Sequence, residues 1–251
     1  MLDKLDINHI IKIAKNAGSK ALEIYNTHNL QIDYKDDNSP LTKADIQANQ
    51  IICDNLKKLF PKIPIISEEN KQIDYNIRKK YLYYWCIDPI DGTKEFIQKN
   101  GEFTINIALI YKNTPVLGVV YAPVLDELYY AKKGYGAFKN NKKLPLVKTS
   151  TNKYIITASK SHLSTETKQF INNIKTSKEK VIISKGSSLK LCMIASGEAD
   201  IYPRLSPTME WDTAAADAIV RESGKMVYQY NSNIPLQYNK PDLTNPWFIV
   251  E

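Results

Sequence analysis

The sequence has few of the residues that mark secreted, membrane-spanning or zinc-binding proteins. Its 251 residues include 3 Cys, 3 His and 9 Gly. The widely spaced cysteines lie among apolar neighbours, which indicates buried side chains in a reducing compartment. Neither CxxC nor HExxH occurs, so no zinc site is expected. Walker, GxGxxG and GxSxG motifs are also absent.

The sequence has no long hydrophobic run, and we expect no export signal. The longest apolar stretches, such as 116–121, have the length of a strand rather than a membrane span. Asp3 and Asp6 lie where a signal peptide would need a basic start. We therefore expect a cytoplasmic protein without an integral membrane segment, and peripheral association with the inner membrane stays open.

Positive charge exceeds negative charge, but it is dispersed. There are 34 Lys+Arg against 27 Asp+Glu, a formal net charge of +7. The lysine pairs at 57–58, 79–80, 132–133 and 142–143 never extend to a run of five. This pattern favours a solvated surface and a small anionic substrate, in a monomer or homodimer with no nucleic-acid polymer as partner. The alternative is a nucleic-acid-binding or regulatory protein, whose binding to long DNA or RNA would depend steeply on salt.

Hydrophobic periodicity predicts a layered α/β protein. Helices are expected over 7–28 and 42–60. An apolar strand is expected at 63–66, and further strands at 81–87, 103–111, 116–121 and 128–131. After residue 150, strands at 154–158, 181–184, 199–202 and 225–229 alternate with helices at 164–174, 188–196 and 212–223. We expect an α/β sandwich with alternating layers of helices and sheets. The division is into subdomains 1–150 and 151–251, with a partly parallel sheet in the second.

Two carboxylates follow the strand at 81–87 around a proline, in the segment Asp88-Pro89-Ile90-Asp91-Gly92-Thr93. Pro89 favours an extended approach, and Gly92 permits a backbone conformation that side chains disfavour. A short helix is expected from Thr93. Because Asp, Pro and Gly are common turn residues, the alternative interpretation is a turn with a helix cap.

Further acids lie where other elements begin or end. Glu68-Glu69 follows the strand at 63–66, and Asp212 opens an alanine-rich helix, where by itself it would be read as an N-cap. Mg²⁺ prefers oxygen ligands and needs only a few carboxylates. Together these acids predict a magnesium site shared by distant parts of the chain.

These motifs resemble the inositol-monophosphatase superfamily of Mg²⁺-dependent, lithium-sensitive phosphatases, which have the sugar-phosphatase fold. Closer similarity is to its bacterial 3'(2'),5'-bisphosphate nucleotidase branch, over 37–45, 92–96, 100–110, 118–123, 202–204, 207–208 and 210–215. The similarity covers essentially the whole chain. Asp217 departs from this branch, where a small residue or Gly-His is more usual, and we expect this difference to be peripheral.

The resemblance implies roles for individual residues. Metal ligands would be Glu68, Asp88, Asp91, Asp212 and the Ile90 carbonyl, and Glu69 would lie behind them. Asp45 and Thr93 would orient and deprotonate the attacking water, without a covalent enzyme intermediate. Backbone amides of Gly92 and Thr93 would bind the scissile phosphate, which Glu68, Ile90, Asp91 and Asp212 would also surround.

We expect the residues that select the substrate to lie in the second half of the chain. The segment 186–190 opens a helix with small residues and a lysine, a pattern suited to anions. By resemblance, Ser159, His162, Gly186, Lys190 and Arg204 would hold adenosine and its 5'-phosphate. The alternative interpretation is that His162 is an ordinary exposed loop residue and Lys190 a solvated helix residue.

The implied reaction is hydrolysis of 3'-phosphoadenosine 5'-phosphate, a by-product of sulfate-donor chemistry, to AMP and phosphate. The 5'-phosphosulfate stays open as a second substrate. An inositol or sugar monophosphate phosphatase is the alternative. A family member that binds nucleotide without turnover is disfavoured. The residues that would bind the metal or activate the water are all intact: Asp45, Glu68, Asp88, Asp91, Thr93 and Asp212.

Overall fold

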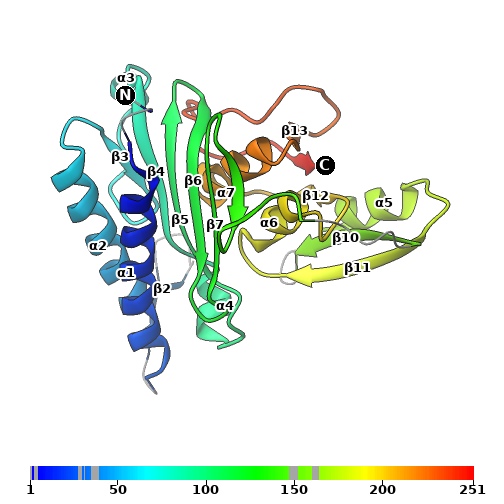
Figure 1. Ribbon diagram of the computed structural model, residues 1–251, viewed down its shortest axis with the longest axis horizontal. Helices are drawn as coiled ribbons and strands as arrows, with labels where there is room; N and C mark the ends of the chain where they lie inside the picture. The colour runs from blue at the N-terminus through cyan, green and yellow to red at the C-terminus, as the bar shows by residue number, and fades with distance from the viewer. Residues whose placement is uncertain are drawn as a thin grey trace.

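A computed structural model describes residues 2, 5–27, 30, 32–34, 40–146, 152–159 and 164–251. Its centre is a seven-stranded sheet in the order β3-β4-β5-β6-β7-β8-β9 (Figure 1). The strands are β3 (Ile65–Ser67), β4 (Tyr83–Asp91), β5 (Thr104–Tyr111), β6 (Thr114–Ala122), β7 (Glu127–Lys132), β8 (Gly136–Lys139) and β9 (Lys142–Lys143). Only the β3–β4 pair within this sheet is parallel.

Two long helices cover one face of the sheet: α1 (Ile7–Tyr25) and α2 (Lys43–Leu59) (Figure 1). Both are amphipathic, and their apolar sides form one core with the sheet. Asp6 caps α1, and Thr42 caps α2 through a reciprocal contact with Asp45. A two-stranded antiparallel sheet, β1 (Ile32–Tyr34) with β2 (Pro40–Thr42), leads into α2.

The opposite face is covered by α7 (Glu210–Glu222) and α6 (Leu189–Ser196) (Figure 1). The backbone of α7 touches the sheet at Gly118 of β6. A Cβ atom on Gly118 would lie 2.0 Å from the Ala215 carbonyl oxygen. The small residues of α7 and Gly118 therefore let the helix lie directly on the sheet, which fixes the position of its first turn.

Of the remaining elements, a parallel strand pair extends away from this sheet (Figure 1). β10 (Lys153–Ser159) and β11 (Glu179–Lys185) form a parallel pair. A second small sheet has the antiparallel order β12-β14-β13, from β12 (Tyr202–Arg204), β14 (Phe248–Val250) and β13 (Val227–Gln229). The short helices are α3 (Tyr75–Arg78), α4 (Thr93–Ile97) and α5 (Thr165–Asn173).

The predicted layered α/β architecture is confirmed, with several local corrections. β4 continues through Pro89 to Asp91, because a register shift against β5 accommodates the proline. α7 begins two residues earlier than expected, and β12 begins three residues later than the strand expected at 199–202. The sequence did not predict the short elements β1, β2, α3, β8, β9 and β14. The subdomain division near residue 150 stays a prediction.

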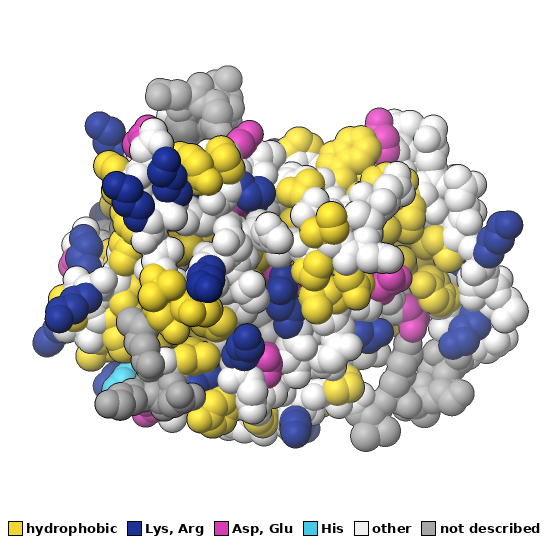
Figure 2. Space-filling model, turned by 90° about the horizontal axis from the view of Figure 1, so that it is seen from above, with side chains coloured by type: hydrophobic (Ala, Val, Ile, Leu, Met, Phe, Trp, Pro, Cys, Tyr) yellow, Lys and Arg dark blue, Asp and Glu magenta, His cyan; other side chains and the backbone are white. Residues whose placement is uncertain are grey.

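The cysteines and the surface agree with the composition. All three cysteines are free and buried. Figure 2 shows Lys and Arg side chains separated by hydrophobic and uncharged surface rather than joined in one patch. No helix in the described part of the chain is both long enough and apolar enough to cross a membrane.

Candidate active site

The end of β4 brings two acids to one cavity. The register shift between Asp88 and Asp91 makes the strand irregular at this point. Asp88 Oδ1 accepts a hydrogen bond from the Ile90 amide at 3.1 Å. Gly92 follows with φ +93°, a left-handed conformation that favours glycine, and α4 begins at Thr93. Glu68 lies next to this strand, since its amide donates to the Ile87 carbonyl at 3.2 Å.

Asp45 reaches the site through Thr93. It is buried in the first turn of α2, where its Oδ2 accepts the Thr42 amide at 2.7 Å. Thr93 Oγ1 lies 3.3 Å from Asp45 Oδ1 and 3.4 Å from the Ile90 carbonyl oxygen. A short hydrogen-bonded path therefore runs from the cavity wall to a buried carboxylate.

Asp212 lies in the first turn of α7 but is not the N-cap that the sequence suggested. It is the third residue of the helix, and its Oδ2 accepts a hydrogen bond from the amide of Met209, the N-cap, at 2.9 Å. The carboxylate is thereby folded back over the helix start. This holds it beside the cavity.

The start of α6 binds a carboxylate of the protein itself. Ser188 donates to Asp91 Oδ2 from its amide at 2.6 Å and from its hydroxyl at 2.7 Å. Asn106 Nδ2 lies 3.2 Å from the same oxygen. The sequence predicted that this helix start would serve the substrate, and that role stays a prediction. The structure shows that one of its amides holds Asp91, and the left-handed Ser187 (φ +43°) immediately precedes Ser188.

A cavity of about 300 Å³ joins these groups. The predicted site residues that line it are Glu68, Asp88, Ile90, Asp91, Gly92, Thr93, Ser159, Lys190, Arg204 and Asp212. Asp45 and Gly186 lie outside its lining, and His162 falls outside the described residues. The structure thus brings together four acids that are separated by up to 144 positions in the sequence.

Crowding of the acids changes their proton affinity. Burial raises the pKa of Asp88 well above its usual range, and the charges of Glu68, Asp91 and Asp212 raise it further. Burial, followed by the Asp91 charge, raises the pKa of Asp212 to about 8. The pKa of Asp91 is also raised by burial, while Lys190 and the Ser188 hydrogen bonds oppose the shift.

The donor chemistry of this wall fits a hard cation such as Mg²⁺. Its groups are carboxylate and carbonyl oxygens, and their mutual repulsion falls when a cation binds. Within the described ranges, no three acidic, histidine or cysteine side chains are already grouped as a set that could hold a metal ion. Asp88, Asp91 and Asp212 each give one oxygen to a protein N–H donor instead.

Basic and aromatic side chains also line the cavity. Lys190 is buried, contrary to the alternative of an exposed lysine, and burial lowers its pKa to about 8. Its Nζ donates to the carbonyl oxygens of Ser187 at 2.5 Å and Lys185 at 3.2 Å. Arg204, Tyr202 and Phe248 are further residues of this lining.

Two polar atoms in the cavity lining have no protein partner. Among the described residues, Arg204 Nε and Ser187 Oγ are buried without a hydrogen bond. Buried polar groups are normally satisfied, so atoms of this kind indicate a place for a polar ligand. Ser187 was not singled out from the sequence, although it lies inside the predicted segment 186–190.

Gly186 supports the site by close packing. A Cβ atom there would lie 2.7 Å from the Glu102 carbonyl oxygen. The Glu102 carboxylate accepts the Gly186 amide at 3.0 Å and pairs with Lys185 Nζ at 3.1 Å. Glu95 also lines the cavity. Glu95, Glu102 and Ser188 were not predicted as site residues, because nothing local in the sequence shows which distant groups they meet.

The fold and the site define a class of protein. The model of the inositol monophosphatase family matches residues 4–247, and the chain belongs to this family. A Shigella flexneri protein named 3'(2'),5'-bisphosphate nucleotidase CysQ is 41% identical over 249 residues, 97% of this chain and 98% of the relative. The predicted resemblance to this branch is confirmed.

Solved structures agree with this assignment. The crystal structure of CysQ from Bacteroides thetaiotaomicron is 44% identical, with a TM-score of 0.89 over 99% of this chain and 98% of that chain. An IMPase of Thermotoga maritima is 26% identical, with a TM-score of 0.78 over 98% of this chain and 91% of that chain.

Proposed function

We propose that this protein is a Mg²⁺-dependent phosphatase that hydrolyses adenosine 3',5'-bisphosphate to AMP and phosphate. The observation that carries the proposal is a single cavity lined both by Glu68, Asp88, Asp91 and Asp212 and by Lys190 and Arg204. A ligand with two phosphates matches both sets of groups, because one phosphate would meet the acids through a cation while the second would meet the basic groups. The name carried by the relatives from Shigella flexneri and Bacteroides thetaiotaomicron supports the same substrate class.

Each set of groups has a defined task in this proposal. Glu68, Asp88, Asp91, Asp212 and the Ile90 carbonyl would hold Mg²⁺, which supplies charge neutralisation for the phosphate and acidifies a water molecule. Thr93 and Asp45 would orient the attacking water and accept its proton along their hydrogen bond. The Gly92 and Thr93 amides would bind the phosphate oxygens.

The basic groups would select the substrate. Lys190 keeps its positive charge below a pKa of about 8, so it is cationic at neutral pH. Within the described residues, Arg204 Nε and Ser187 Oγ have no hydrogen-bond partner, and they would donate to phosphate or ribose oxygens. Tyr202 and Phe248 offer aromatic surface for a nucleobase. We also propose that the same site accepts the 5'-phosphosulfate as a substrate.

The test is a phosphate-release panel. Adenosine 3',5'-bisphosphate, its 5'-phosphosulfate analogue and inositol 1-phosphate are compared with and without Mg²⁺, and again with Li⁺. We expect Mg²⁺-dependent, Li⁺-sensitive release that is fastest from the bisphosphate. Preference for inositol 1-phosphate would refute the nucleotidase assignment and favour a monoester phosphatase, whereas release without any divalent cation would refute the metal site.

Lys190→Ala tests the second phosphate. Because the ammonium contributes to ground-state binding, we expect KM for the bisphosphate to rise about tenfold or more, with a smaller change for a simple monoester. Lys132→Ala is the matched control, since Lys132 is also buried and also donates to a backbone carbonyl, but outside this cavity. An equal rise in KM for the bisphosphate and for the monoester would show that Lys190 does not recognise the second phosphate.

A further inference from the structure

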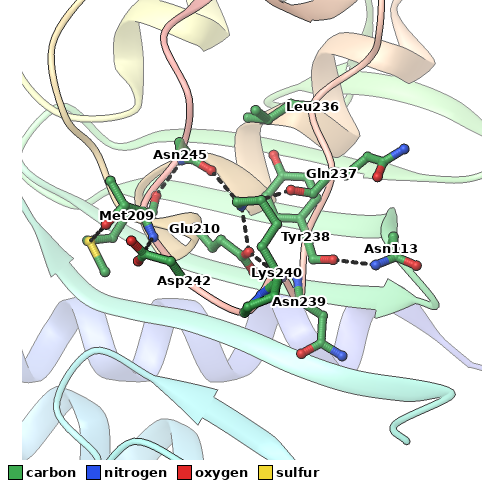
Figure 3. A network of polar contacts seen from close by, with 12 residues as sticks. Asn113, Met209, Glu210, Leu236, Gln237, Tyr238, Asn239, Lys240, Asp242 and Asn245 are labelled. Atoms are coloured by element: carbon green, nitrogen blue, oxygen red, sulfur yellow. Dashed lines mark hydrogen bonds and ion pairs between the residues drawn. The ribbon is translucent and has the colours of Figure 1, made fainter. Parts of the chain in front are cut away.

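A segment late in the sequence forms hydrogen bonds and an ion pair with the first turn of α7. We call residues 239–245 the clamp. The Glu210 carboxylate, 1% exposed, accepts the Asn239 amide at 2.6 Å and the Lys240 amide at 3.0 Å. Lys240 Nζ completes the arrangement with an ion pair to Glu210 Oε1 at 2.6 Å (Figure 3). Glu210 is thus bound by three donors from two neighbouring residues.

The clamp holds the residues on both sides of Glu210 as well. The Asn245 side chain donates to the Met209 carbonyl at 2.7 Å (Figure 3). It also donates to Thr213 Oγ1 at 3.0 Å. The backbone amide of Asn245 donates to the Thr208 carbonyl at 2.7 Å. Thr208 and Thr213 line the cavity together with Asp212, so the clamp fixes one edge of the site.

The other side of the clamp is tied to α3. The buried Arg78 donates to Asn239 Oδ1 at 2.9 Å, to the Lys240 carbonyl at 2.5 Å and to the Pro241 carbonyl at 2.6 Å. Asn239 Nδ2 returns a hydrogen bond to the Arg78 carbonyl at 2.8 Å. The first turn of α7 is therefore anchored to a different part of the molecule, and not only to the sheet beneath it.

This anchoring matters because Asp212 has a short side chain among like charges. Its two side-chain torsions leave the backbone to decide where the carboxylate lies. Repulsion from Asp91 and Glu68 favours movement away from the cavity when no cation is present. Metal sites tolerate displacements of only about 0.5 Å in their ligands. A fixed first turn therefore keeps Asp212 within reach of the cation.

We propose that Glu210 and Lys240 are positioning residues, which set the cation affinity of the site by holding the turn that carries Asp212. This inference rests on the proposed function, because it takes the cation site as given. Neither residue lines the cavity. They act through the backbone of α7 and through the clamp.

The test measures Mg²⁺ binding to the metal-free protein by titration calorimetry without substrate. For Glu210→Gln, which keeps the shape and removes the charge, we expect the Kd for Mg²⁺ to rise about tenfold. Turnover at saturating Mg²⁺ should largely recover. Lys240→Arg retains the positive charge and should bind Mg²⁺ nearly as tightly as the unaltered protein. If Glu210→Gln does not fold, Lys240→Met takes its place, since Lys240 is more exposed.

Asp217→Asn is the matched control on the same helix. Asp217 is also a fully buried carboxylate in an ion pair, to Arg221 at 2.8 Å, but it lies beyond the first turn. This variant should lose thermal stability while its Kd for Mg²⁺ stays within about twofold. An unchanged Kd in Glu210→Gln, or an equal rise in Asp217→Asn, would overturn the positioning role. Absence of Mg²⁺ binding by the unaltered protein would overturn the proposed function together with this inference.

Discussion

Asp91 lines the cavity, and four protein donors hold its Oδ2 atom. Ser188 supplies two of these contacts, Asn106 the third and Thr104, at 3.5 Å, the fourth. An aspartate held in this way keeps its orientation when the cation leaves. It therefore acts as the fixed part of the acidic wall, against which Asp212 and Asp88 must be placed.

Asp91→Asn should abolish turnover. The asparagine oxygen can keep the Ser188 contacts, which would leave an NH₂ donor where a cation needs an acceptor. We expect kcat to fall about 10³-fold or more in the phosphate-release assay. Asp200→Asn is the control, because Asp200 also accepts a backbone amide, that of Ile155 at 2.7 Å, but outside the cavity. Substantial Mg²⁺-dependent activity in Asp91→Asn would contradict the assigned role.

Individual residues also show where sequence reasoning is effective and where it stops. Acids at strand ends and helix starts were recognisable, because a charged group gains nothing from packing there. Ser188 was not, since its partner Asp91 lies 97 positions earlier in the chain and only the fold brings them together. The departure at Asp217 was expected to be peripheral to the site, which stays a prediction, and the structure shows its carboxylate bonded to Arg221 and Tyr238.

Among the elements, α7 is the one whose placement the site depends on most. Its contact with β6 leaves no room for a side chain at Gly118. Any group added there pushes the helix off the sheet and moves Asp212 with it.

Gly118→Ala should therefore destabilise the fold and impair the site together. Overpacking of this kind costs about 1–3 kcal/mol or more, to be measured as the free energy of unfolding in urea. Gly134→Ala is the control: no atom lies within 4 Å of its added Cβ, so it reports only the cost of a left-handed backbone, about 1–2 kcal/mol. Normal stability and activity in Gly118→Ala would show that α7 does not rest on β6 as described.

Long periodic elements were predictable and short ones were not. α1 and α2 follow from their apolar stripes, and the β5–β6 hairpin follows from two apolar runs joined by a short polar turn. β14 has only three residues, and it forms a strand because β12 and β13 flank it. The extension of β4 through Pro89 depends on the partner strand, which no local pattern reveals.

At the scale of the whole molecule, the fold holds mutually repelling carboxylates close together in one cavity. Four acids from β3–β4 and α7 converge on one cavity in a chain whose net charge is positive. The raised pKa values of Asp88, Asp91 and Asp212 are a cost of folding that a bound cation would offset.

This repulsion predicts how pH acts on stability. The folded-state pKa values of Asp88, Asp91 and Asp212 lie above their unfolded value of about 3.9. Between these values the folded protein binds more protons than the unfolded chain, so the free energy of unfolding falls as pH rises. One such proton changes it by about 1.4 kcal/mol per pH unit.

Mg²⁺ should reverse this trend, because it binds the ionised acids. Thermal unfolding of the metal-free protein is compared with and without Mg²⁺ at about pH 5.5 and pH 7.5, below the pKa of Lys190. We expect the Mg²⁺-induced rise in Tm to be larger at the higher pH, and Asp212→Asn to reduce the difference. An equal rise at both pH values would contradict a cation site made of these acids.

The buried cysteines have a practical consequence. Burial raises the pKa of the thiols of Cys53, Cys86 and Cys192, so neither solvent access nor thiolate favours their reaction. A single new cysteine on an exposed loop would thus accept a fluorescent or spin label selectively, with the natural ones left in place. The labelled enzyme would report motion around the cavity during turnover.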